Sequence, residues 1–176
     1  MPSDAQDLKL PAIRGRVAWV FDQPDYDVDQ IVGVKNIKIQ DLDQLAAIAM
    51  ADQDPDFAAR TAPGDVLVAA DNFGYGHPHA PPMRAMRHLG IAAVIAEGFA
   101  PTYYRGEMSL GFPQIACPGV LGLAQRGDEL EIDWDRHLVV NHSRGLSLPF
   151  EPPSPAERRL LALGGHLPAL KAALGV

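Results

Sequence analysis

Short apolar runs alternate with longer segments of helical periodicity along most of the chain. Apolar runs of four to eight residues bounded by turn residues are typical of buried strands, and Leu or Ala at helical spacing indicates amphipathic helices. The predicted strands are 15–21, 66–70, 91–96 and 113–117, and the predicted helices are 41–50, 83–89 and 99–110. Strand, loop, helix and strand within about 30 residues form a βαβ unit with parallel strands. The pattern therefore predicts an α/β fold with a mostly parallel sheet core.

The last third of the chain has a different pattern. Further β segments are predicted at 130–134, 137–141 and 146–150, before a cluster of prolines ends the sheet region. Ser154 and Glu157 then form a capping box that begins a C-terminal helix. We therefore expect a single domain over residues 1–176, with a core over 14–150 and a helical tail over 151–176.

Composition excludes several functions. The chain has 176 residues, with 22 acidic and 15 basic side chains and a formal charge of −7. This acidic balance disfavours nucleic-acid binding, which needs clustered Lys and Arg, and no apolar run approaches the roughly 20 residues of a membrane span. Met1–Pro11 lacks the apolar core of a signal peptide, so we expect a cytoplasmic protein. The single cysteine, Cys117, excludes an internal disulfide framework or a Cys-rich metal cluster held by this chain alone.

The loop after the second predicted strand is the richest in chemistry. It reads DNFGYGHPHAPP over residues 71–82, and functional loops of βαβ units lie at this carboxyl end of the strand. Its Gly-Tyr-Gly is too short for a dinucleotide fingerprint. Tyr75 and Gly76 are instead candidates for close approach to a ligand or partner.

An ordered set of motifs extends through the chain. It comprises GRVAWVF at 15–21, DVDQI at 27–31, DPDF at 54–57, GDVLVAA at 64–70, NFGYG at 72–76 and GIAAVIA at 90–96. Together with later matches through 127–133, this set resembles the small subunit of 3-isopropylmalate dehydratase, the detached swivelling domain of the aconitase superfamily. The resemblance covers about residues 14–150.

The resemblance implies a swivelling β/β/α fold that docks onto a larger subunit. In that family the large subunit carries a four-iron, four-sulfur cluster whose open iron acts as Lewis acid on the substrate hydroxyl. The implied partners are thus a cluster-bearing large subunit and a small carboxylate such as isopropylmalate, in leucine biosynthesis, with no cofactor on this chain. The lone Cys117 fits that division.

The two loops that would touch substrate depart from the family pattern. After Gly-x-Gly the family usually reads Ser-Ser-Arg-Glu-His, whereas this chain has His-Pro-His-Ala-Pro over 77–81, and Tyr75 replaces the usual Cys. The recognition loop falls on 36–39, which is also unlike the usual Tyr-Leu pattern. We interpret this as the same class of reaction on a different substrate.

These positions suggest roles. His77 stands where the family has its serine base, and imidazole, with an unperturbed pKa of about 6.5, can accept a proton from carbon at neutral pH. His79, in place of the arginine, is a candidate to bind a substrate carboxylate. The helix beginning near Pro82 directs its positive end to the same space. The other candidate substrate contacts are Tyr75, Gly76, Asn36, Lys38 and Arg84.

Other interpretations stay open. The His-Pro-His segment can be a rigid surface loop without chemistry, or His77 and His79 can chelate a divalent metal. The whole chain can be a non-catalytic, anion-binding or regulatory homo-oligomer on the same scaffold. Asp25, Asp27 and Asp29 lack the spacing of a calcium loop and are interpreted as a solvated or amide-bonded turn.

Overall fold

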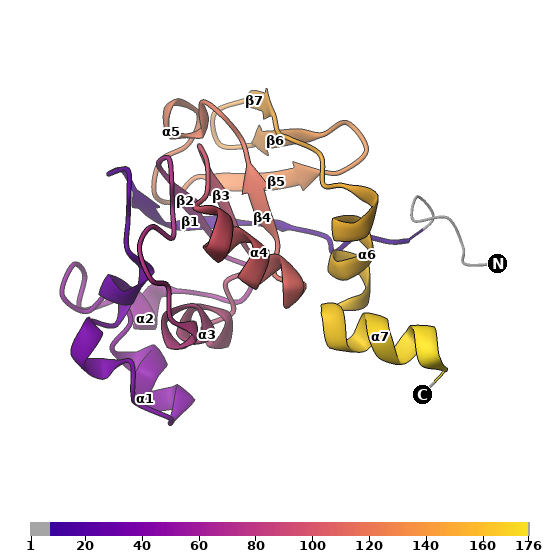
Figure 1. Ribbon diagram of the computed structural model, residues 1–176. Coiled ribbons are helices and arrows are strands. Elements are labelled where there is room, and N and C mark those ends of the chain that lie inside the picture. The colour runs from indigo at the N-terminus through magenta and orange to yellow at the C-terminus, as the bar shows by residue number, and fades with distance from the viewer. Residues whose placement is uncertain (1–7, 176) are drawn as a thin grey trace.

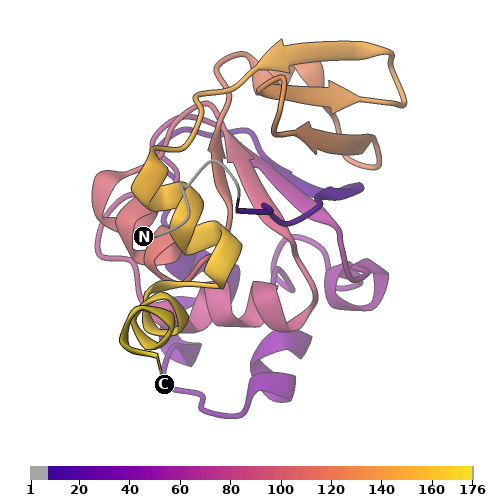
Figure 2. The same cartoon turned by 90° about the vertical axis from the view of Figure 1, so that its right-hand side faces the viewer.

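A single seven-stranded sheet runs through the computed structural model, which describes residues 8–175 (Figure 1). The strands are β1 (Arg14–Phe21), β2 (Val66–Ala69), β3 (Ala93–Ala96), β4 (Gln114–Ala116), β5 (Glu129–Asp133), β6 (Leu138–Asn141) and β7 (Leu146–Pro149). Their spatial order is β4-β3-β2-β1-β5-β6-β7. β1 to β4 are parallel, whereas β5 to β7 pair antiparallel and curl away from the parallel part (Figure 2).

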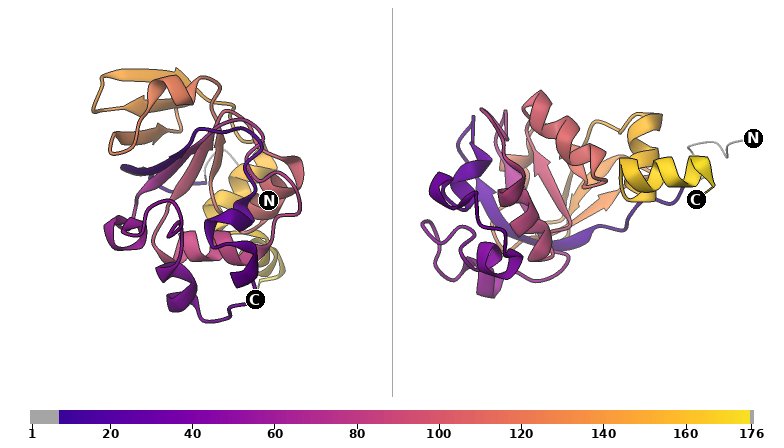
Figure 3. Two further views of the ribbon diagram at one scale, coloured as in Figure 1. Left: turned by 90° about the vertical axis from the view of Figure 1, so that its left-hand side faces the viewer. Right: turned by 60° about the horizontal axis from the view of Figure 1, so that its bottom comes forward.

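Helices cover the sheet on both faces. They are α1 (Leu42–Ala47), α2 (Phe57–Arg60), α3 (Ala80–His88), α4 (Pro101–Ser109), α5 (Val120–Leu123), α6 (Pro155–Leu163) and α7 (His166–Leu174), with 3-10 turns η1 (Val28–Ile31) and η2 (Val34–Asn36). Figure 3 shows the helices α1 to α3 grouped on one side of the molecule, away from α6 and α7. None of the helices within residues 8–175 is long and apolar enough to cross a membrane.

Strand alternation divides the apolar interior into two cores. In β2, Leu67 and Ala69 face the core beneath η1, α1 and α3, while Val66 and Val68 face the core beneath α5 and β5. All four residues are fully buried, because a parallel central strand is covered on both faces. This explains why the sequence of β2 is continuously apolar rather than alternating.

The fold expected from the sequence is confirmed in its main features. The mixed sheet with a parallel core is present, and Ser154 and Glu157 form the expected capping box, with the Glu157 carboxylate accepting from the Ser154 N–H at 2.7 Å. Four short elements, η1, η2, α2 and α5, were not predicted because three or four residues carry no periodicity. α5, for example, depends on the distant Glu97, whose carboxylate accepts the N–H groups of Gly119 and Leu121.

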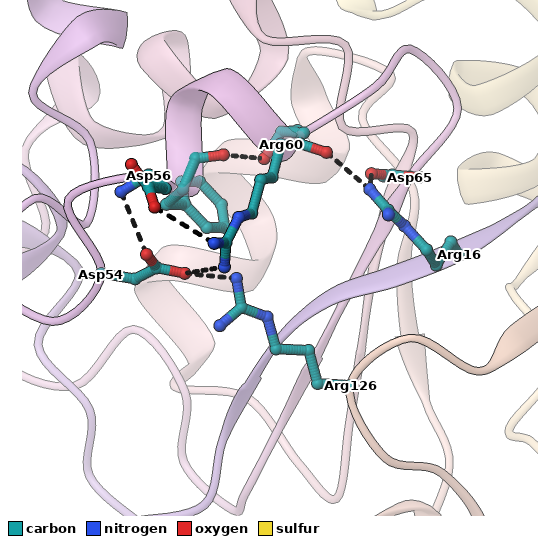
Figure 4. A network of polar contacts seen from close by, with 8 residues as sticks. Arg16, Asp54, Asp56, Arg60, Asp65 and Arg126 are labelled. Atoms are coloured by element: carbon teal, nitrogen blue, oxygen red, sulfur yellow. Dashed lines mark hydrogen bonds and ion pairs between the residues drawn. The ribbon is translucent and has the colours of Figure 1, made fainter.

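β1 joins the two parts of the sheet. Its first residues pair with β5 and its later residues with β2. At Gly15 a side chain would stand 1.8 Å from the carbonyl oxygen of Gly64, so no larger residue fits where the two segments cross. The neighbouring Arg16 donates to Asp65 at 2.9 Å and to the carbonyl oxygen of Arg60 at 2.6 Å, which fastens β1 to the segment before β2 (Figure 4).

A charged network continues from this crossing. Asp54 lies between two arginines, with Arg126 at 2.5 Å and Arg60 at 4.0 Å, and Arg60 also pairs with Asp56 at 3.1 Å (Figure 4). The Arg126 guanidinium lies 4.6 Å from the centre of the Trp19 ring. The hydrogen bond from Arg126 lowers the pKa of the Asp54 carboxyl below its ordinary value of 3.8.

Replacing Asp54 by Asn should lower the melting temperature at pH 7. Because the pKa of Asp54 is lower in the folded chain, its ion pairs stabilise the fold above about pH 4 and are lost as the carboxyl is protonated at lower pH. The difference between Asp54→Asn and the parent should therefore shrink below pH 3.8. Thermal unfolding across pH 3 to 8 measures it, with Asp56→Asn as control because Asp56 makes a single, exposed ion pair. A difference that does not change with pH would contradict this account.

Candidate functional site

The loops that follow β1, β2 and β3 meet around Phe73. Its ring is fully buried, with centres 5.1 Å from Phe21 and 5.3 Å from Tyr103. Its N–H donates to Gly98 at 3.1 Å, and its carbonyl oxygen accepts from Ala100 at 2.9 Å. Phe73 thereby fixes the start of the 71–82 loop against the loop after β3.

The next residue, Gly74, sets the path of the loop toward solvent. It has a φ of +88°, and a side chain there would lie 2.1 Å from the Tyr103 ring. Its N–H donates to the carbonyl oxygen of Tyr26 at 3.0 Å, which ties the loop to the one after β1. Beyond this point Tyr75 and Gly76 are exposed.

His79 is held by a buried carboxylate. Asp29 Oδ2 lies 2.6 Å from His79 Nδ1, and Asp29 Oδ1 accepts the His79 backbone N–H at 3.1 Å. The Asp29 side chain is 6% exposed and that of His79 is 50% exposed. The buried carboxylate of Asp29 thus fixes both the ring and the backbone N–H of the exposed His79.

The aspartates of the first loop bond to amides, as the sequence indicated. Asp27 accepts the N–H of Asp29 at 2.9 Å, and Asp25 accepts the side-chain amide of Asn72 at 2.6 Å. The partnership of Asp29 with His79 was not anticipated. The signal available in the sequence was three acids at alternate positions directly after a strand, but the two partners are 50 residues apart.

The helix after the loop begins earlier than predicted. α3 begins at Ala80 with His79 as its N-cap residue, rather than near Pro82. Pro81 and Pro82 occupy the first turn, where the N–H that proline lacks has no partner in any case. The positive end of the helix therefore lies at His79, and Arg84 is exposed on the following turn.

The remaining candidate site residues lie in the 71–82 loop or around η2. His77 is exposed two residues before His79. Asn36 donates its side-chain amide to the carbonyl oxygen of Val32 at 2.7 Å, and Lys38 is exposed between η2 and α1. Among the hydrogen bonds and ion pairs described for residues 8–175, none joins Asn36 or Lys38 to the 71–82 loop.

A groove of about 340 Å³ borders His79. It runs between the start of α3 and the outer face of α4, with Pro78, Ala80, Tyr103 and Leu110 among its lining residues. The Tyr103 hydroxyl is buried and has no hydrogen-bond partner among the described residues, and burial raises its pKa well above 10. This groove gives the surface beside His79 a largely apolar wall.

Potential metal ligands are not clustered in the part of the chain that the structure describes. Within residues 8–175 no group of three or more His, Cys, Asp or Glu side chains is arranged to hold a metal ion. Cys117 is fully buried with its thiol 3.5 Å from the carbonyl oxygen of Pro149, and burial raises its pKa to about 11. A thiol in this setting does not fit an iron–sulfur cluster, which is bound by thiolates.

Comparison with known proteins identifies relatives over nearly the full length. The chain is 38% identical over 161 residues to a 3-isopropylmalate dehydratase small subunit of Methanopyrus kandleri, covering 90% of this chain and 92% of the relative. It is 35% identical to an isopropylmalate/citramalate isomerase small subunit of Methanocaldococcus jannaschii, covering 90% and 94%. It is 34% identical to a 2,3-dimethylmalate dehydratase small subunit of Eubacterium barkeri, covering 79% and 85%.

The fold agrees with these matches. A crystal structure of a 3-isopropylmalate dehydratase from Methanocaldococcus jannaschii superposes with a TM-score of 0.81 at 32% identity, covering 93% of this chain and 96% of that one. No protein-family model matches the chain. The curled mixed sheet and the loops gathered at its parallel end are thus those of an aconitase-type swivelling domain, a small subunit of a hydro-lyase. The chain belongs to the family of 3-isopropylmalate dehydratase small subunits.

Two glycines near the groove should respond oppositely to the same substitution. Gly74→Ala forces a left-handed residue against Tyr103 and should destabilise the fold by about 2–5 kcal/mol. Gly106 lies within α4 with open space around it, so Gly106→Ala should stabilise by roughly 0.5–1 kcal/mol. Urea unfolding of both variants measures the two effects. Equal effects would show that the contact of Gly74 with Tyr103 does not constrain the loop.

Proposed function

We propose that this chain is the small subunit of a hetero-oligomeric hydro-lyase that acts on a 2-hydroxy di- or tricarboxylate such as isopropylmalate or a related alkyl-malate. The observation that supports it most is the match to small subunits of malate-derivative dehydratases over about 90% of the chain. The shared fold brings the 71–82 loop to the carboxyl end of the parallel strands, where ligands of open α/β sheets bind.

The proposal includes a large partner subunit. The relatives are named small subunits, and the described residues of this chain offer no ligand set for a cluster. We expect the large subunit to hold a four-iron, four-sulfur cluster, which would act as Lewis acid on the substrate hydroxyl. This chain would then contribute recognition and proton transfer.

The loop over residues 75–79 is the proposed contribution to the reaction. It carries His77, at the sequence position of the family's base, and His79, at the position of the carboxylate-binding arginine. The N-terminus of the nine-residue helix α3 adds positive potential beside an anionic substrate. Tyr75, Gly76, Asn36, Lys38 and Arg84 are proposed as further substrate contacts.

The substrate is proposed as a class. The three relatives are named for isopropylmalate, citramalate and dimethylmalate, which differ in the alkyl groups on a malate skeleton. In this chain the wall beside His79 is largely apolar, with Pro78, Ala80 and Leu110 in its lining. An alkyl substituent fits such a wall, while the histidines and the helix N-terminus suit the carboxylates.

The isolated chain should have no activity, and activity should appear with the large subunit. The full chain would be purified with its co-purifying partner, the cluster reconstituted without oxygen, and hydration and dehydration of 3-isopropylmalate, citramalate and 2,3-dimethylmalate assayed for each subunit alone and for the complex. Turnover only by the complex is expected, because neither chain alone would hold all reacting groups.

Two results would contradict the proposal. Full activity of the isolated chain would exclude the two-subunit mechanism. A stable homo-oligomer that binds a small carboxylate and never forms an active complex would favour the alternative, a non-catalytic anion-binding or regulatory module.

A further inference from the structure

The two loop histidines differ in what holds them. His79 Nδ1 is 2.6 Å from Asp29, and the same carboxylate accepts the His79 backbone N–H at 3.1 Å. The hydrogen bonds and ion pairs described for residues 8–175 include none to the side chain of His77. His79 is therefore held by a buried carboxylate, whereas His77 is exposed without a side-chain partner among the described residues.

The contact with Asp29 also determines which ring nitrogen of His79 carries the proton. An ionised carboxylate is an acceptor only, so the short contact requires the hydrogen on Nδ1. In the neutral ring Nε2 then has a free lone pair. A ring in this state accepts a proton at Nε2, whereas binding a substrate carboxylate would require a hydrogen there.

From this geometry we propose that His79 Nε2, and not His77, is the proton-transferring atom of the loop, and that Asp29 is its positioning residue. This inference rests on the proposed hydro-lyase function. It exchanges the roles that the sequence positions suggested for His77 and His79. The resemblance to the family indicates where each histidine lies in the loop, whereas the hydrogen-bond partner determines which ring nitrogen can accept a proton. His77 then remains a substrate contact.

The proposed step is a proton transfer between a substrate carbon and His79. In dehydration, Nε2 of neutral His79 takes the proton from the carbon next to a carboxylate. The electron pair of that C–H bond becomes the second bond of the alkene, and the hydroxyl on the neighbouring carbon leaves as hydroxide with the C–O bonding pair, to the Lewis acid that the large subunit would supply. In hydration hydroxide adds to one alkene carbon and the imidazolium returns its proton to the other, while Nδ1 keeps its hydrogen bond to Asp29.

Asp29 is held in place by the buried residues of η1 on either side of it. It lies in η1 between Val28 and Ile31, which are buried in the core at 0% and 1% exposure. The carbonyl oxygen of Ile31 accepts from the N–H of Met50 at 2.7 Å, and Asp27 accepts the N–H of Asp29 itself. A carboxylate held by core residues keeps the ring of His79 in one orientation, as proton transfer to carbon requires.

The first test reads the tautomer directly in the full isolated chain. Histidine ring ¹⁵N NMR near pH 8 should show the hydrogen of His79 on Nδ1. His88 gives an internal contrast, since its Nε2 is the atom 2.6 Å from Asp43, so its hydrogen should be on Nε2. Finding the hydrogen of His79 on Nε2 would overturn the proposal whatever reaction the complex performs.

Asp29→Asn tests the positioning role. The side-chain oxygen of Asn still accepts the His79 backbone N–H, but its amide donates to Nδ1 and so moves the ring hydrogen to Nε2. The NMR signals of His79 should switch tautomer while the fold is kept. Asp43→Asn is the matched control, because it should change the signals of His88 and leave those of His79 as they are.

Kinetics of the assembled complex test the base role. His79→Gln should lower kcat at least about 100-fold, and Asp29→Asn should lower kcat at least about tenfold with little change in KM. His77→Gln should raise KM more than it lowers kcat, and Asp43→Asn should match the parent.

The kinetic outcomes distinguish a failure of the base role of His79 from a failure of the proposed hydro-lyase function. If the parent complex is active and His79→Gln does not reduce its turnover, the base role of His79 is rejected and the proposed function is kept. The same holds if His77→Gln abolishes turnover and His79→Gln does not. A parent complex with no turnover on any alkyl-malate would reject the proposed function and the base role with it, and only the measured tautomer would stand.

Discussion

The packing of Phe73 is the constraint on which the functional end of the molecule depends. Three loops converge on this one residue, through its ring and through both of its backbone groups. A fully buried phenylalanine at the mouth of a parallel sheet fixes where each loop leaves the core. The residue after Phe73 is a glycine, because the Tyr103 ring leaves no room for a side chain at position 74. The histidines can be exposed and yet well placed because the residues just before them are immobilised.

Charge is distributed to match this arrangement. The chain carries a net charge of −7, yet its proposed substrates are anions. Near the loop, the acids Asp25, Asp27 and Asp29 accept hydrogen bonds from amides or from His79, and of the three only Asp29 is buried. The imidazoles of His77 and His79 are exposed beside the N-terminus of α3, and Asp25 and Asp71 are exposed in the neighbouring loops. Local hydrogen bonding, more than overall composition, therefore sets what this surface can bind.

The sequence predicted the elements that carry their own signal. The apolar strands, the helices with capping residues and the glycine-rich loop could all be predicted from neighbouring residues. What could not be predicted depends on residues far apart in the chain. Asp29 and His79 are 50 positions apart, and α5 requires Glu97 of another loop at its N-terminus. The start of α3 was misplaced because the two prolines are compatible with the first turn as well as with the segment before it.

The residues at one end of the parallel strands make the family evident from the sequence, whereas those at the other end do not identify the substrate. The motifs at 54–57 and 64–70 build the crossing of β1 with β2 and the ion pairs of Asp54 and Asp65, where a change in one residue would leave a partner unpaired. At the other end Phe73 and Gly74 hold the loop by its first residues. Over residues 75–81 every residue is exposed or half-buried, and a different set of side chains can be accommodated without disturbing the core. Within the His-Pro-His segment, His79 meets the buried carboxylate of Asp29 from η1. The scaffold thus retains the motifs of its family, and under the role proposed for His79 the chemistry of the loop depends on the side chain that meets the Asp29 carboxylate.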